Sequence, residues 1–189
     1  MAATDYSELK ATKSESQLLR HFRRRPLLGN DERAQLCEVR GRRDDIRRIL
    51  PHRPPLLFVD SVDAVSADRE TIVGTRVFRD DDPVFTGHFP GNPVYPGTFQ
   101  VEAIGQLGLC LWYFRLNPER LEIATDSEPV SAFATRIGGA MFSAPVRPGT
   151  TAQLVARRLE GDEMRGSMIG QLIIDDTVCT TAIGEVVFP

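Results

Sequence analysis

The chain has 189 residues, 41% of them hydrophobic, a formal net charge of -3 and a mean hydropathy of -0.21. This length suits one ordinary domain with its own core, and no stretch is long and apolar enough to span a bilayer. The acidic balance argues against general nucleic-acid binding. Three scattered cysteines, Cys37, Cys110 and Cys179, give neither a disulfide framework nor metal-ligand spacing. Residues 1–8 lack the basic-then-apolar order of a secretory signal, so we expect a cytoplasmic protein.

Residues 1–43 differ from the rest of the chain, because they are polar, weakly periodic and rich in arginine. They indicate a basic N-terminal extension ahead of a single domain over residues 44–189. We expect a solvated and partly flexible arm; the alternative is a docking surface for an acidic partner. Short helices are expected over residues 16–22 and 31–39, separated by Pro26 and Gly29.

The domain itself reads as one long helix and about six strands. Asp44 and Asp45 suit the start of a short helix that Pro51 ends. The strands are expected over residues 56–66, 71–78, 130–140, 151–159, 164–174 and 178–187. The turns that separate the last of them are of hairpin length, so we expect antiparallel pairing.

The segment over residues 98–116 is apolar on nearly all sides, which predicts a helix buried on most of its surface. Gly105 and Gly108 lower its helix propensity and are explained if another backbone comes close. A curved antiparallel sheet wrapped around this helix would bury both. The sequence therefore predicts an α+β architecture that is hot-dog-like.

A histidine and a glutamate carry the predicted chemistry. His88 lies in the loop of residues 80–97, which prolines and glycines make rigid, and Glu102 follows in the second turn of the apolar helix. Burial there should raise the pKa of the Glu102 carboxyl, so that it donates a proton, with Gln106 one turn on to orient it. A neutral His88 can accept a proton. The pair suits removal of a proton next to a carbonyl with loss of a hydroxyl as water.

Gly97, directly before the helix, adds a group that can bind negative charge. Unpaired N–H groups at the helix start can hold a carbonyl oxygen that gains charge, and a glycine lets a ligand approach the backbone. Purely structural roles remain open for the pair: His88 could bond a loop carbonyl, and Glu102 could pair with a buried arginine such as Arg136.

Four segments resemble the 3-hydroxyacyl-[acyl-carrier-protein] dehydratases of the FabZ type. They are ILPHRPPLLFVD at 49–60, GHFPGNPVYPG at 87–97, VEAIGQ at 101–106 and FSAPVRPG at 142–149. The resemblance implies a hot-dog fold and a lyase that removes water from (3R)-hydroxyacyl thioesters on an acyl carrier protein, giving trans-2-enoyl products in fatty-acid or polyketide-type biosynthesis.

The resemblance also implies roles for single residues. His88 corresponds to the catalytic base, Glu102 to the catalytic acid and Gly97 to the glycine that holds the thioester carbonyl. The Val94 carbonyl corresponds to the group that positions the histidine ring, and Gln106 to the support of the acid. The family completes its site across a dimer, and it needs no metal or organic cofactor because phosphopantetheine arrives with the substrate.

The chain departs from the family pattern at Tyr95, at Met141-Phe142 and in its long arm. Three alternatives therefore stay open: a hot-dog acyl-thioesterase, an enoyl hydratase, and a non-catalytic partner subunit of a heteromeric dehydratase. The assembly could be a homodimer, a trimer of dimers, or a heterodimer with a sister dehydratase. His52 is expected to be structural, and Cys110 and Trp112 to lie in the core.

Overall fold

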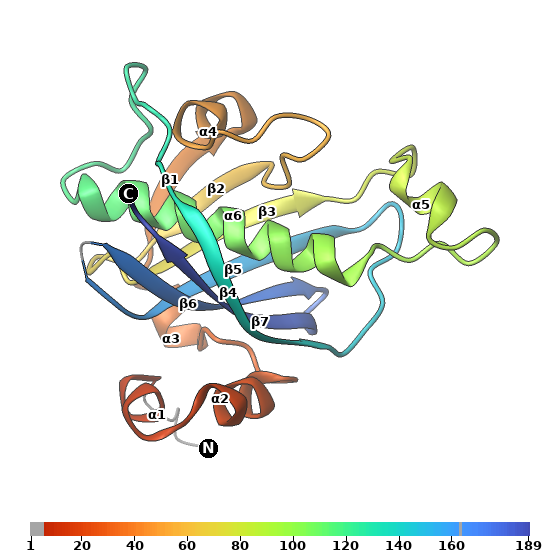
Figure 1. The fold of residues 1–189 in the computed structure, drawn as a ribbon, viewed down its shortest axis with the longest axis horizontal. Coiled ribbons are helices and arrows are strands. Elements are labelled where there is room, and N and C mark those ends of the chain that lie inside the picture. The colour runs from red at the N-terminus through yellow and green to blue at the C-terminus, as the bar shows by residue number, and fades with distance from the viewer. Residues whose placement is uncertain (1–5, 163) are drawn as a thin grey trace.

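The computed structural model describes residues 6–162 and 164–189 as one long helix against a single sheet, with short helices around them (Figure 1). Residues 1–5 lie outside the described residues. They are part of the segment, residues 1–8, from which the absence of a secretory signal was predicted. The elements are α1 (Tyr6–Thr12), α2 (Glu15–Phe22), α3 (Asn30–Arg33), β1 (Cys37–Arg42), α4 (Arg43–Ile49), β2 (Ser61–Val65), β3 (Thr71–Val77), α5 (Val84–Gly87), α6 (Gly97–Leu116), β4 (Phe133–Phe142), β5 (Thr151–Gly161), β6 (Arg165–Ile174) and β7 (Thr177–Val187).

The strands form one antiparallel sheet in the order β1-β2-β3-β5-β6-β7-β4. The predicted α+β class with a long helix and an antiparallel sheet is confirmed. The sheet has seven strands because β1, inside the expected arm, pairs with β2. Buried and exposed residues alternate along β1, as expected for a strand. Val39 and Gly41 are buried, while Glu38 and Arg40 are exposed. The helix expected over residues 31–39 is therefore limited to α3.

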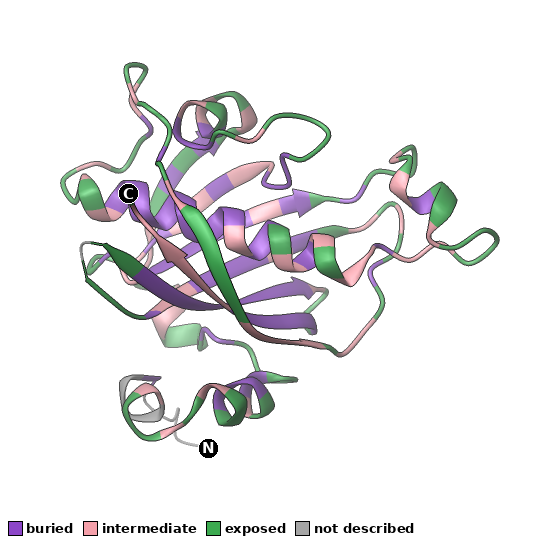
Figure 2. Cartoon of the chain, in the orientation of Figure 1, coloured by how far each residue is buried: buried purple, intermediate pink, exposed green. Residues whose placement is uncertain are grey.

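Helix α6 lies along one face of the sheet and is buried over most of its length (Figure 2). Its all-round apolar sequence predicts this burial. The prediction that another backbone comes close to Gly105 and Gly108 is wrong within the described residues. A Cβ at Gly108 would lie 1.7 Å from the sulfur of Met168, so this glycine makes room for a side chain, while a Cβ at Gly105 would meet nothing within 4 Å. Cys110 and Trp112 lie in the core, as predicted.

The described part of the arm covers the other face of the sheet. Neighbouring strand residues separate the two cores: Ile72 and Leu154 belong to the core under α6, whereas Val73 and Val155 belong to a second core with α1 and α2. Figure 1 shows these two helices, in red, below the sheet. Where the sequence indicated a solvated arm, the structure buries Leu18, Leu19 and Phe22 from it. Whether residues 44–189 fold without the arm stays a prediction.

Two segments between the elements shape the site. Residues 56–60, expected to begin a strand, are irregular, although Leu57, Phe58 and Val59 are fully or nearly fully buried beside α6. Residues 80–97, expected to have no regular element, contain the single turn of α5 before His88, and Gly97 at their end is already the first residue of α6. Within the described residues, no helix is both long and hydrophobic enough to cross a bilayer.

Candidate active site

His88 directly follows α5 and is held by a hydrogen-bonded loop. Its Nδ1 lies 2.8 Å from the carbonyl oxygen of Val94, and the Val94 N–H donates to the His88 carbonyl oxygen at 2.8 Å. The peptide bond to Phe89 is cis, and the two rings stack with centroids 4.0 Å apart. Because a carbonyl oxygen can only accept, a neutral His88 carries its proton on Nδ1 and leaves Nε2 as the acceptor.

A buried arginine contacts two side chains of the loop that holds His88. Arg76 of β3 lies 3.3 Å from an Asp60 oxygen, 3.6 Å from an Asp82 oxygen and 3.4 Å from the Tyr95 hydroxyl. Its guanidinium also lies over the Phe58 ring, 5.5 Å from the centroid. Burial raises the pKa of Tyr95, and Arg76 opposes that shift. No sequence pattern pointed to Arg76 as a site residue, since an arginine in a strand usually faces solvent.

The start of α6 lies in the same hollow as His88. This hollow of about 540 Å³ is lined by the loop, by Gly97 and by Phe142 and Ser143 at the end of β4. Within the described residues, the N–H groups of Gly97 and Thr98 have no hydrogen-bond acceptor, as is usual for the first turn of a helix. A Cβ at Gly97 would lie 2.6 Å from the Phe142 ring, so close packing also requires glycine here.

Glu102 and Gln106 lie one helical turn apart on α6, as predicted from their spacing. Gln106 donates to a Glu102 carboxylate oxygen at 2.8 Å. The same amide donates to the Leu56 carbonyl oxygen and accepts from the Phe58 N–H, both at 2.8 Å. Gln106 is 1% exposed and uses both ends of its amide. It therefore ties the irregular segment to the helix and holds the Glu102 side chain in one direction.

The expectation that Glu102 is buried is wrong for the single chain. Its side chain is 47% exposed, because this face of α6 points away from the sheet that the helix covers. The exposed side chain of Leu56 belongs to the segment that Gln106 ties to the same turn. Burial, the physical reason given for a proton-donating Glu102, is thus missing within one chain.

His52, expected to be structural, is the second neighbour of Glu102. Its Nε2 lies 3.4 Å from a Glu102 oxygen, and its buried Nδ1 has no partner within the described residues. The alternative pairing of Glu102 with Arg136 is wrong, because Arg136 pairs with Glu15 and Glu185. Because His52 and Glu102 are fifty residues apart in sequence, no local pattern could have predicted their contact.

The structure does not join the two predicted catalytic groups. Within the described residues, no hydrogen bond or ion pair links His88 to Glu102, and Glu102 does not line the hollow that holds His88. The contact of His88 with the Val94 carbonyl is predicted by both the catalytic and the purely structural interpretation, so it does not distinguish them. The catalytic roles therefore stay predictions.

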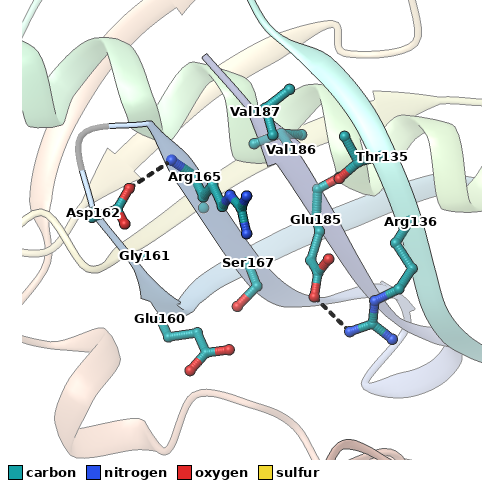
Figure 3. A pocket seen from close by; sticks show the side chains of 11 residues that line it. Thr135, Arg136, Glu160, Gly161, Asp162, Arg165, Ser167, Glu185, Val186 and Val187 are labelled. Atoms are coloured by element: carbon teal, nitrogen blue, oxygen red, sulfur yellow. Dashed lines mark hydrogen bonds and ion pairs between the residues drawn. The ribbon is translucent and has the colours of Figure 1, made fainter. Parts of the chain in front are cut away.

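A second hollow, of about 600 Å³, lies elsewhere, between the ends of β4, β6 and β7 (Figure 3). Figure 3 shows Arg136 paired with Glu185 on its wall. It contains none of the predicted site residues, so its larger volume does not make it the better candidate. Among the described residues, no group of histidine, cysteine and carboxylate side chains is arranged to hold a metal ion.

Comparison with known proteins identifies the family. The family described as FabA-like domain matches residues 50–182. The chain belongs to the FabA-like family. The 3-hydroxyacyl-[acyl-carrier-protein] dehydratase FabZ of Campylobacter jejuni is 39% identical over 104 residues, which cover 55% of this chain and 67% of the relative. The FabZ of Campylobacter curvus is 34% identical over 141 residues, covering 73% and 90%.

A solved structure agrees with the fold. The dehydratase heterocomplex ApeI:P from Xenorhabdus doucetiae contains a chain with a TM-score of 0.60 and 18% identity, covering 76% of this chain and 90% of that one. The resemblance to FabZ-type dehydratases and the hot-dog fold are confirmed. The family match begins at residue 50, so the whole of the arm, residues 1–43, lies outside it.

Proposed function

We propose that the protein removes water from (3R)-hydroxyacyl thioesters carried on an acyl carrier protein and forms trans-2-enoyl thioesters. One observation carries the proposal. The unbonded nitrogen of His88 and the unpaired N–H groups at Gly97 belong to one hollow. An acceptor for a carbon-bound proton and donors for a carbonyl oxygen are what this reaction needs in one place.

The proposed mechanism assigns one step to each group. His88 Nε2 takes the proton from the carbon next to the thioester carbonyl, while the Gly97 N–H holds the oxygen that gains negative charge. The bond between the third carbon and its hydroxyl breaks, and Glu102 gives that hydroxyl a proton, so that water leaves. His88 ends protonated and Glu102 ionised. Return of one proton between them restores the enzyme, and no metal or organic cofactor takes part.

The substrate brings its own phosphopantetheine arm in this proposal. The FabZ relatives, named for acyl-carrier-protein substrates, support a role in fatty-acid synthesis. A polyketide-type pathway uses the same chemistry and is the alternative setting for the same reaction.

We also propose that the working unit is at least a homodimer. Glu102 is half-exposed, it does not reach His88, and the hydrophobic Leu56 beside it is 55% exposed. Strand β4 is an edge of the sheet, and its Phe133 and Ile137 side chains are exposed. A second copy that covered these groups would bury Glu102 and bring it to the partner's hollow. Unpaired apolar edge strands usually have such a partner.

Single substitutions test the reaction. His88→Ala and Glu102→Gln should each lower water removal from a (3R)-hydroxybutyryl carrier protein at least about 100-fold. Side-by-side assays with hydroxyacyl, enoyl and simple acyl thioesters separate a dehydratase from a hydratase or a thioesterase. Dehydration at the wild-type rate in either variant would overturn the proposal, and activity restored only by a sister subunit would favour a partner subunit.

Mixing the two variants tests the dimer. Subunits that exchange at random form heterodimers in which one of the two sites combines an intact His88 with an intact Glu102. About a quarter of the wild-type activity should then return. No recovery despite proven subunit exchange would place both residues of each site in one chain.

A further inference from the structure

The turn that follows α2 is held by hydrogen bonds from buried side chains of the sheet. Gln171, on β6 and fully buried, donates from its amide nitrogen to the carbonyl oxygens of Phe22 and Arg25 at 2.8 Å each. Its amide oxygen accepts from the Leu27 N–H at 2.8 Å, and the Thr181 hydroxyl donates to the Phe22 carbonyl oxygen at 3.2 Å. The backbone of residues 22–27 therefore has one defined path.

This turn presents three consecutive arginines, Arg23, Arg24 and Arg25, and we call it the arginine turn. All three are exposed, and within the described residues none of their guanidinium groups has a hydrogen bond or an ion pair. Most other arginines of the chain do have such partners. Burial lowers the pKa of the neighbouring His21, and Arg25 lowers it further. The turn is thus a concentrated and uncompensated positive charge.

The arginine turn lies beside the proposed active site. The Ser143 hydroxyl donates to the Arg23 carbonyl oxygen at 3.1 Å, and Ser143 lines the hollow that contains His88 and Gly97. The turn and the site wall are far apart in sequence and meet only through the fold. Since the family match begins at residue 50, this feature belongs to the extension of this chain.

We propose that the arginine turn is a docking surface for the acyl carrier protein, where the three guanidinium groups bind carboxylates around the point at which the phosphopantetheine arm is attached. The inference rests on the proposed function for the identity of the partner. Its physical basis is that unpaired arginines on a well-held backbone at the rim of a site attract an acidic partner and orient it. Order in the turn lowers the entropy lost when the carrier binds.

The test compares two triple variants of the full-length protein. In one, Arg23, Arg24 and Arg25 are replaced by glutamine. In the matched control, Arg40, Arg42 and Arg47 are replaced by glutamine. These control residues are also exposed and lie in or beside β1 and α4, at the opposite edge of the sheet from β4. Both variants lose three positive charges, and thermal unfolding checks that both are folded.

Two measurements decide the outcome. The first is the dissociation constant for a bacterial acyl carrier protein with its phosphopantetheine arm, measured by fluorescence anisotropy at low salt. The second is kcat/KM for a hydroxybutyryl group on that carrier, on coenzyme A and on N-acetylcysteamine. The arginine-turn variant should bind the carrier about tenfold more weakly. It should lose kcat/KM by a similar factor on the carrier alone, and the control variant should change less than twofold.

Three results would overturn the inference: unchanged carrier binding in the arginine-turn variant, an equal loss in the control, or an equal loss on coenzyme A. The last would mean that the arginines hold the phosphate of the arm. Wild-type protein that binds the carrier through the arginine turn but removes no water would overturn the proposed function and leave the docking surface intact.

Discussion

Replacement of Gln106 by methionine separates the contribution of this side chain to folding from its contribution to the site. Methionine has a similar length and remains compatible with a helix, but it has no donor and only a weak acceptor. The variant loses the bonds from Phe58 and to Leu56, and the bond that holds Glu102. We expect a loss of both stability and activity.

The magnitude follows from the burial of each bond. The bond with the Phe58 N–H is buried, and leaving that donor unpaired costs about 1–3 kcal/mol. The bond to the Leu56 carbonyl is only partly buried, so its loss costs about 0.5–1.5 kcal/mol. The free energy of unfolding should therefore fall by about 1.5–4.5 kcal/mol, which lowers Tm by roughly 3–18 °C for a chain of this size.

Urea denaturation at fixed protein concentration measures the first effect, and formation of the enoyl thioester measures the second. Glu102→Gln is the matched control, because it leaves both backbone bonds of Gln106 in place. It should unfold within about 0.5 kcal/mol of wild type, because the amide oxygen of the new glutamine can accept the same hydrogen bond from Gln106, while losing water removal. A Gln106→Met protein that loses less than about 1 kcal/mol would refute the hydrogen-bonding role assigned to this glutamine.

Three further substitutions have equally definite outcomes. His52→Gln removes the ring 3.4 Å from Glu102, so kcat should fall about tenfold with little change in KM; an unchanged kcat would return His52 to a structural role. Gly108→Ala should cost about 1–3 kcal/mol in chemical denaturation, because its Cβ would overlap Met168, and the double variant with Met168→Ala should lose less stability than the sum of the two single variants. Arg76→Met leaves two carboxylates and a tyrosine hydroxyl without their common partner and should cost about 3–5 kcal/mol; a variant as stable as wild type would show that this cluster does not hold the loop.

Local patterns in the sequence determined most of the elements. The all-round apolar segment predicted α6, because a helix without a polar face must be buried, and the short apolar runs between turns predicted β3 to β7. The strand β1 was missed because its six residues are half charged and half small or apolar, which does not distinguish a strand at a sheet edge from an arm.

The same kind of pattern located the predicted site. His88, Gly97, Glu102 and Gln106 lie within nineteen residues of each other, and their spacing predicted the contact of Gln106 with Glu102. Helix geometry alone fixes such a contact, since residues four apart share a face.

Only the tertiary structure decided which distant groups join these residues. It places His52 beside Glu102, Arg76 beneath Tyr95, and the arginine turn beside Ser143. It also leaves Glu102 half-exposed in the single chain, although the mostly apolar residues around it in the sequence predicted burial. The physical reason is the same in each case. Burial and long-range contact depend on which faces of the sheet and helix are covered, and in this protein an N-terminal arm covers one face of the sheet while α6 turns Glu102 away from the other.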